Sequence, residues 1–238
     1  MDDLLNQIDS WHQTFQHKKI IKAIEKVPEK ERGYELTGLL ARALMNSGEG
    51  RESLRLLESI SDQGSEDWVW FFRMGVVLVL LECGHEADGY LRRCLALGGP
   101  VEDVNTVLEQ AHENIAARHA HVEEVVALVG ANGDDGWVTE NGIPPSPRVV
   151  HTLFTADEDS ARTAAARIEK NGYTFISVES ARTAGFRGVG RRAWVVVAAH
   201  RDVAVTPEYL YTTRAFFESL AIRIPGGVYD GWEADRPQ

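Results

Sequence analysis

The sequence predicts an α+β protein of two domains, a helical first half and a smaller second half with an antiparallel sheet. Apolar residues recur three and four positions apart through residues 1–129, as amphipathic helices require. Residues 148–238 instead alternate strand-like apolar runs with helical patterns. The intervening residues 130–147 are rich in Gly, Pro, Asn and Asp, and this composition sustains neither a helix nor a central strand. We therefore predict a domain over 1–129, a linker over 130–147 and a domain over 148–238.

The composition is that of an ordinary globular protein with an unevenly distributed acidic charge. Of the 238 residues, 44% are hydrophobic and 26% charged, which excludes general disorder. Residues 1–129 hold 13 basic and 22 acidic side chains, whereas residues 148–238 hold 12 and 11, for a net charge of −11 over the whole chain. Such a change in charge marks two modules with different surfaces. The acidic balance argues against a protein that coats nucleic acid or a membrane surface.

The location predicted from the sequence is the cytoplasm. The chain has two cysteines, Cys83 and Cys94, so a disulfide framework is excluded and a reducing compartment is favoured. The start, MDDLLNQIDSW, is acidic and lacks the basic and apolar regions of a secretory signal. The most apolar run, residues 71–81, contains Arg73 and has about half of the residues that a bilayer requires. We expect this run to form a buried helix, and we predict no membrane association.

Apolar stripes divide the helical half into consecutive helices. They lie at residues 20–24, 36–44, 54–60, 70–81 and 90–95, and one or two more helices lie within 102–129. Residues 53–57 align with residues 87–91 at an offset of 34, and Gly48 and Gly84 mark the turn in each helix pair. This pattern resembles a tetratricopeptide repeat (TPR) array, and the resemblance implies a concave protein-binding surface. The alternative is a generic helical bundle.

Two pairs of side chains in the helical half are candidates for binding sites. Trp68 and Trp70 lie two positions apart near a helix start, so they point about 200° apart and cannot face the same core. One of them should be more exposed, and we take Trp68 as a candidate partner-binding residue. His112 and His119 lie about 10 Å apart on one helix face, too far to share an ion without a third group between them. We expect no metal site and no other cofactor.

The second half is predicted to contain two helices and four strands. The strands are expected at residues 148–154, 173–178, 193–199 and 228–232, the last as a strand or turn. Thr155 and Glu158 form a capping box that starts the first helix, and Thr206 with Pro207 starts the second. The β-α-β-β-α-β order predicts a ferredoxin-like domain, with an antiparallel sheet and two helices on one face.

Four motifs of this half resemble the RraB family, regulators of ribonuclease E activity. They are His151-Thr-Leu-Phe154 on the first strand, Asp157-Glu158 at the helix start, Asn171-Gly172-Tyr173 before the second strand, and Gly227-Val-Tyr229-Asp230-Gly231-Trp232 near the end. The last motif is the most specific. The resemblance implies a non-catalytic protein that binds the nuclease or its assembly and lowers its activity on RNA. Whereas the family members that regulate the enzyme are strongly acidic in this domain, here the acidity lies in the helical half.

The final motif supplies three candidate partner-binding residues, Tyr229, Asp230 and Trp232. As rigid amphipathic side chains, the tyrosine and the tryptophan would anchor a partner. In the alternative interpretation, Trp232 covers the end of the sheet and Asp230-Gly231 forms the tight turn that places it.

The loop over residues 182–192 supplies two more candidates, Phe186 and Arg187. It holds four Arg and three Gly, so it would suit phosphate or an acidic protein. Its glycine spacing is not a nucleotide-binding fingerprint, because no helix follows. The alternative is a solvated hairpin connection.

The sequence therefore predicts a non-enzymatic, protein-binding regulator that inhibits a ribonuclease of the RNase E type. It shows no paired acid and base and no Gly-x-Ser-x-Gly motif that would support catalysis. An acidic surface over residues 1–129 would steer the protein toward a basic, RNA-binding partner. The alternative is an immunity protein that neutralises a cognate bacterial toxin, because a helical module joined to a small α+β domain resembles such proteins. Direct RNA binding has only the Arg-rich loop in its favour, and the oligomeric state is left open.

Overall fold

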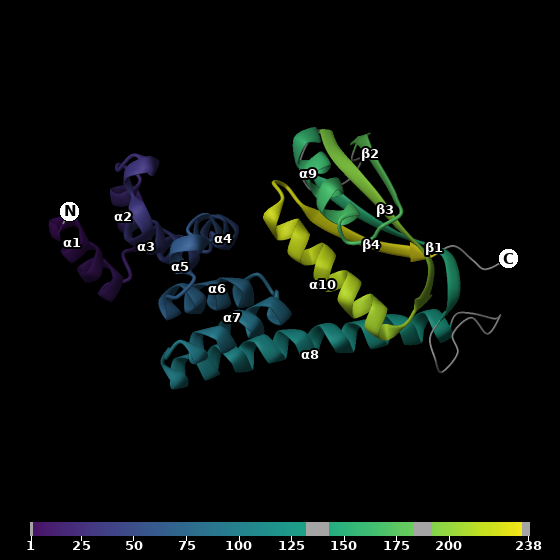
Figure 1. Ribbon diagram of the computed structural model, residues 1–238, viewed down its shortest axis with the longest axis horizontal. Coiled ribbons are helices and arrows are strands. Elements are labelled where there is room, and N and C mark those ends of the chain that lie inside the picture. Colours follow the sequence, from purple (N-terminus) through teal and green to yellow (C-terminus); the bar gives the residue numbers. More distant parts are fainter. Residues whose placement is uncertain (1, 132–142, 183–191, 235–238) are drawn as a thin grey trace. The chain divides into compact units, whose positions relative to one another are not determined.

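The computed structural model describes residues 2–131, 143–182 and 192–234. Its contacts define two compact units, Met1–Ile115 and Ala116–Gln238. The first unit is helical, and the second contains the sheet (Figure 1). The predicted α+β class with a helical first part is thus confirmed.

The domain boundary predicted from composition is not settled by these units. The predicted linker, residues 130–147, lies largely outside the described residues. The two units meet within the long helix α8 (Val101–Ala131), so the last turns of α8 belong with the sheet. A helical pattern in the sequence does not show which neighbour the helix packs against, and this assignment could not be made from the pattern alone.

The first unit consists of helices that pack in consecutive pairs. Their bounds are α1 (Asp2–Gln13), α2 (His17–Ile24), the 3₁₀ turn η1 (Glu29–Glu31), α3 (Gly33–Asn46), α4 (Gly50–Ser59), α5 (Ser61–Gly64), α6 (Trp68–Leu80) and α7 (Gly84–Ala96), followed by the start of α8. α3 packs on α4, and α6 packs on α7. The buried side chains come from the predicted stripes, among them Ile20, Leu54, Met74 and Leu91. Each stabilises the unit by about 1.5–3 kcal/mol relative to an exposed position.

The two helix pairs repeat at an offset of 34 residues. α3 ends at Asn46 and α6 at Leu80, and the partner helices α4 and α7 begin at Gly50 and Gly84. The left-handed turn residue of the first pair is Gly48, with φ +84°, and its equivalent in the second pair is Glu82, with φ +60°. Gly48 therefore lies in the first turn as predicted, whereas Gly84 follows the second turn and is the first residue of α7. Gly84 is needed for another reason, since a Cβ there would lie 2.5 Å from the carbonyl oxygen of Ala111.

The second unit is an antiparallel sheet with the strand order β2-β3-β1-β4 among the described residues. The elements follow each other as β1 (Ile143–Thr155), α9 (Glu158–Glu169), β2 (Phe175–Arg182), β3 (Arg192–Val205), α10 (Pro207–Arg223) and β4 (Val228–Ala234). This confirms the predicted antiparallel sheet with helices. The ferredoxin-like assignment stays a prediction, as does the TPR assignment of the first unit.

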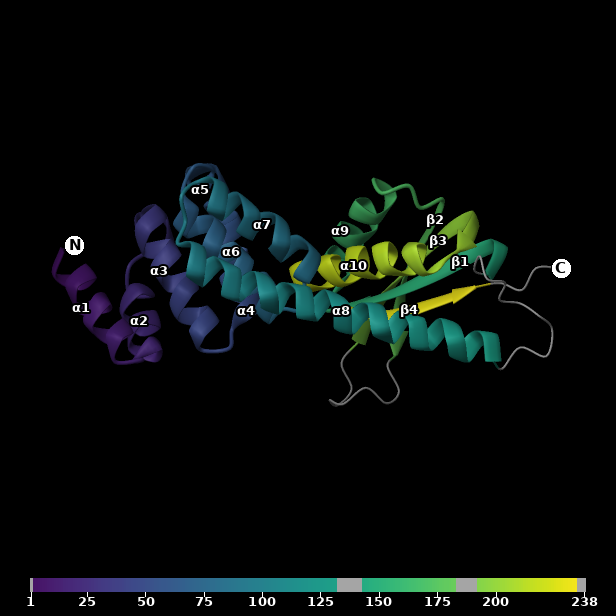
Figure 2. The same ribbon diagram turned by 90° about the horizontal axis from the view of Figure 1, so that it is seen from below.

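One face of the sheet is covered by α9 and α10 (Figures 1 and 2). Leu153 and Val196 pair across β1 and β3, so their side chains point to the same face. Both are fully buried, and they pack in one cluster with Ala161 of α9 and Phe217 of α10. This cluster fixes which face of the sheet remains uncovered by the two helices.

Helix α9 begins two residues later than the predicted capping box indicated. The carboxylate of Asp157 accepts a hydrogen bond of 2.8 Å from the Ser160 N–H and caps the helix. The predicted capping box of Thr155 and Glu158 is therefore wrong. The Thr155 hydroxyl donates to the Asp157 carbonyl instead, and Glu158 pairs with Arg162. An aspartate at this position also places negative charge at the positive end of the helix dipole.

Candidate partner-binding site

The Tyr-Asp-Gly-Trp motif forms a β-bulge inside the edge strand β4. Tyr229 pairs with Leu153 and Gly231 pairs with Thr152, so Asp230 is an extra residue between them. Gly231 has φ +115°, a backbone conformation that glycine adopts without strain. The tight turn expected at Asp230-Gly231 is therefore a bulge within a strand.

The bulge places two aromatic side chains on the covered face of the sheet. In a regular strand, residues three positions apart point to opposite faces. With the extra residue, Tyr229 packs against the cluster of Leu153 and Phe217, and Trp232 packs against a neighbouring cluster formed by Val149, Val205 and Leu210. These contacts support the structural interpretation of Tyr229 and Trp232. Asp230 is exposed, whereas Tyr229 and Trp232 are partly buried.

His151 on β1 is the polar centre of this core. It is fully buried, with Nδ1 2.9 Å from the hydroxyl oxygen of Tyr229 and Nε2 3.2 Å from that of Tyr209. In a neutral imidazole one nitrogen donates and the other accepts, so the two tyrosines take complementary roles. The ring stacks on Phe217 with 4.7 Å between centroids. The sequence singled out His151 and Tyr229 separately, but nothing in the spacing of the two residues indicated that they meet.

The surroundings keep this network neutral. Burial and, to a smaller extent, the nearby His200 lower the pKa of His151 to about 3. Burial also raises the pKa of Tyr229 and of Tyr209 above the ordinary value of a tyrosine. Because both ring nitrogens of His151 are occupied by hydroxyl groups, the network specifies the packing of β1, β4 and α10 and offers no exposed acid or base.

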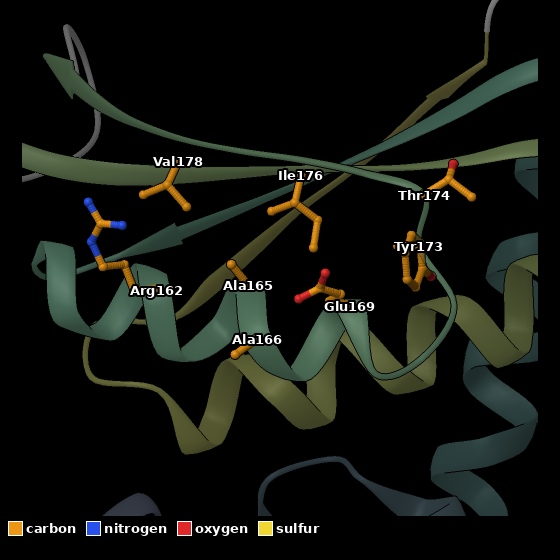
Figure 3. A pocket seen from close by; sticks show the side chains of 8 residues that line it. All are labelled: Arg162, Ala165, Ala166, Glu169, Tyr173, Thr174, Ile176 and Val178. Carbon is orange, nitrogen blue, oxygen red and sulfur yellow. The ribbon is translucent and has the colours of Figure 1, made fainter.

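A groove of about 390 Å³ lies between α9 and β2, at the sheet edge opposite β4 (Figure 3). Its lining residues are Arg162, Ala165, Ala166, Glu169, Tyr173, Thr174, Ile176 and Val178. Ile176 and Val178 project from the strand toward α9, and Arg162 marks one end (Figure 3). The small side chains of Ala165 and Ala166 leave room between helix and strand. The groove lies between two consecutive elements and depends on how α9 packs against β2, which no sequence motif indicates.

The groove combines the chemical features that bind an extended peptide. β2 is an edge strand, and the outward peptide groups of an edge strand are free to pair with another strand. The apolar side chains of Ile176 and Val178 provide a floor, with a cationic and an anionic side chain, Arg162 and Glu169, on the helix side. Main-chain pairing gives affinity in such sites, and pockets for alternate side chains give selectivity.

The remaining predicted residues lie elsewhere. Phe186 and Arg187 are outside the described residues, in the segment that connects β2 and β3. Trp68 is 36% exposed, whereas Trp70 is 6% exposed and donates from Nε1 to the Leu57 carbonyl at 2.9 Å. The predicted contrast between the two tryptophans is confirmed. Trp68 belongs to the helical unit, whereas Tyr229, Asp230 and Trp232 belong to the unit that contains the sheet.

The second unit also includes the end of α8. Arg118 forms an ion pair with Glu218 of α10, and the ring of His119 stacks on Tyr211 at 4.0 Å between centroids.

Residues 119–234 match the family model of Regulator of ribonuclease activity B (RraB). The C-terminal part of the chain is an RraB domain. The RraB match begins in α8, well before the motifs from His151 onward that indicated the family in the sequence. No curated protein matches the chain.

Two histidines of α8, His112 and His119, have partners other than a metal ion. The Nε2 atom of His112 lies 2.9 Å from a carboxylate oxygen of Asp88, and His119 stacks on Tyr211. Within the described ranges, no three His, Cys, Asp or Glu side chains gather as a metal site requires. None of the helices in the described part of the chain has the length and apolar character needed to cross a bilayer.

Proposed function

We propose that this protein restrains a ribonuclease of the RNase E type by direct protein contact and without catalysis of its own. The RraB match over residues 119–234 carries the proposal, because the family is described as a regulator of ribonuclease activity. In this proposal the RraB domain is the effector, the helical unit is a scaffold that docks the partner, and the complex forms in the cytoplasm.

The groove between α9 and β2 is the proposed contact for the nuclease. An extended segment of the nuclease would add as a strand beside β2 and place an apolar side chain on Ile176 and Val178. Arg162 and Glu169 would each select an oppositely charged side chain of that segment. The free edge of β2 supports an extended partner rather than a helical one.

The proposal is tested by RNA cleavage assays with purified ribonuclease E and the full chain. The wild-type protein should lower the cleavage rate in proportion to complex formation. Ala166→Arg places a long cation in the groove on an exposed helix position, and we expect it to raise the concentration needed for half-inhibition about tenfold or more. Thr163→Arg adds the same charge to an exposed position of α9 outside the groove lining, and it should inhibit like the wild type.

The outcomes separate the function from the contact surface. If the wild-type protein neither binds the nuclease nor slows cleavage, the proposed function is wrong. If it inhibits but both arginine variants inhibit equally well, the function stands and the groove is not the contact. Equal loss in both variants would mean that added positive charge on α9, rather than the groove, controls association.

Two finer assignments of the fold belong to the same proposal. We infer that the helix pairs are TPR-like repeats, and the 34-residue offset between Gly50 and Gly84 supports this. We also infer a ferredoxin-like sheet, which the strand order β2-β3-β1-β4 supports. We further infer that the chain divides into a helical domain over residues 1–129, a linker over 130–147 and a second domain over 148–238.

The other candidate contacts are proposed in a secondary role. Trp68 in the helical unit and Asp230 on β4 are exposed, and Phe186 and Arg187 belong to the segment after β2. The acidic balance of residues 1–129 should speed association with a basic nuclease. Association should accordingly weaken as salt is raised, and reversal of acidic residues in the helical half should reduce that salt dependence more than changes in the second half.

A further inference from the structure

Four basic side chains gather in the acidic helical unit. They come from four different helices: His12 at the end of α1, His17 at the start of α2, Arg42 on α3 and Arg73 on α6. α2 contacts both α1 and α3, and α3 contacts α6 (Figure 2). The rings of His12 and His17 lie 5.8 Å apart between centroids. We call these four side chains the basic cluster.

The basic cluster contains polar atoms that have no hydrogen-bond partner. Both ring nitrogens of His12 and the Nδ1 atom of His17 are buried without a partner in the described part of the chain. Over the same residues, neither Arg42 nor Arg73 forms a hydrogen bond or an ion pair with another side chain. Each neutral imidazole has one N–H to donate, and Arg42 is exposed while Arg73 is half-buried. Because most buried polar groups in folded proteins are hydrogen-bonded, these unpaired groups suit a site for an oxygen acceptor.

The guanidinium of Arg73 is held in a gap provided by a glycine. A Cβ at Gly38 on α3 would lie 2.5 Å from the Nη1 atom of Arg73. Burial and the neighbouring Arg42 lower the pKa of Arg73, whereas Tyr34 and Asp67 oppose this shift. An anion placed between the two guanidinium groups would compensate both.

The acidic groups near the basic cluster are few and partly engaged. Asp67 lies near Arg73, but its carboxylate accepts from the Tyr34 hydroxyl at 2.6 Å and from the Val69 N–H at 2.9 Å. Asp9 is the other nearby carboxylate, one helical turn before His12. With neutral histidines, the two arginines and two aspartates balance. If one histidine takes up a proton, its single positive charge compensates the single negative charge of one carboxylate ligand. A doubly charged phosphate would need two such charges, so the basic cluster fits a carboxylate better.

We propose that the basic cluster binds a carboxylate side chain from an acidic segment of a protein partner. This site lies in the helical unit and does not depend on the RraB contact proposed above. The acidic charge of the surrounding unit repels such a segment at long range, but this repulsion is screened beyond about 8 Å at physiological salt. At short range, the two arginines therefore select one acidic side chain of a partner.

The same geometry predicts that binding takes up a proton. Burial is the main reason that the pKa of His12 is lowered to about 4, with further contributions from Arg42, His17 and Arg73, and Asp9 opposes them. A bound carboxylate would raise this pKa, so affinity should increase as the pH falls from 7.5 to 5.5. Aspartate and glutamate in a peptide remain mostly ionised over this range.

The test uses the full chain and a fluorescent decapeptide with alternating Glu and Gly, compared with its Gln counterpart. We expect the Glu peptide to bind and the Gln peptide to bind at least tenfold more weakly. Arg73→Gln should weaken binding about tenfold, and Gly38→Ala should weaken it severalfold by displacing the guanidinium while keeping its charge. Arg55→Gln is the matched control, because Arg55 is exposed and already paired with Glu52 on α4.

Three results would overturn the proposal. The first is equal binding of the Glu and Gln peptides, or no binding of either. The second is unchanged affinity in both Arg73→Gln and Gly38→Ala with circular dichroism like that of the wild type. The third is tighter binding of inorganic phosphate than of the Glu peptide, which would assign the basic cluster to phosphate. Histidine ring signals in NMR provide the independent readout, since the His12 signals should titrate at higher pH when the Glu peptide is bound.

Discussion

The buried His151 should make the stability of the RraB domain depend on pH in a defined direction. Its pKa is lowered from 6.5 to about 3 in the folded chain. The unfolded chain therefore binds more protons below pH 6.5, so the stabilising contribution is complete above that pH and is lost as the pH falls toward 3. One unit of pKa difference corresponds to about 1.4 kcal/mol. Between pH 7.5 and 5.0 this single group should lower the free energy of unfolding by about 2 kcal/mol.

The matched variant for this experiment is His151→Gln. Glutamine can donate to one tyrosine and accept from the other, as the neutral imidazole does, but it does not titrate. We expect the variant to be less stable at pH 7.5 and to lack the additional loss of about 2 kcal/mol on acidification. The measurement is amide hydrogen exchange of β3 in urea, which reports on the sheet and not on the helical unit. If wild type and variant lose the same stability between the two pH values, the assignment of the pH dependence to His151 is wrong.

Three smaller predictions concern the same unit. Tyr229→Phe removes the hydroxyl that contacts His151 and leaves one ring nitrogen unpaired, so urea unfolding of the sheet should show a loss of about 1–3 kcal/mol. Gly231→Ala should cost about 1–2 kcal/mol in the same assay because of its φ of +115° alone, since a Cβ there meets nothing within 4 Å; an unchanged stability would contradict the bulge geometry. Asp157→Ala should cost about 1 kcal/mol as a lost helix cap, whereas equal losses in Asp157→Ala and Thr155→Ala would contradict the assignment of the cap.

The sequence predicted the elements of this fold better than their geometry. Periodicity located the helices of the first unit, because apolar side chains at helical spacing have to face a core. It could not locate the cap of α9, since Thr155 and Asp157 are both good caps and the choice depends on where β1 ends. The bulge in β4 was also invisible, because pairing register is set by both strands.

The candidate sites were even harder to predict from the sequence than the geometry of the elements. The Tyr-Asp-Gly-Trp motif indicated the family, but its two aromatic residues pack inward and the groove lies at the other edge of the sheet. The groove is made by α9 and β2, whose lining residues have no shared pattern. The basic cluster joins His12 and Arg73, which are 61 positions apart in the chain. In both cases the chemistry arises from tertiary contact between side chains that are individually unremarkable.

The bulge at Asp230 allows Tyr229 and Trp232 to share one face of the sheet although they are three positions apart in the chain. Deleting Asp230 would leave a regular strand in which the tyrosine and the tryptophan are two positions apart and both still face the helices, because Asp230 is the residue without a partner on β1. Among homologous sequences, a spacing of three with a bulge and a spacing of two without one should therefore be interchangeable between the tyrosine and the tryptophan.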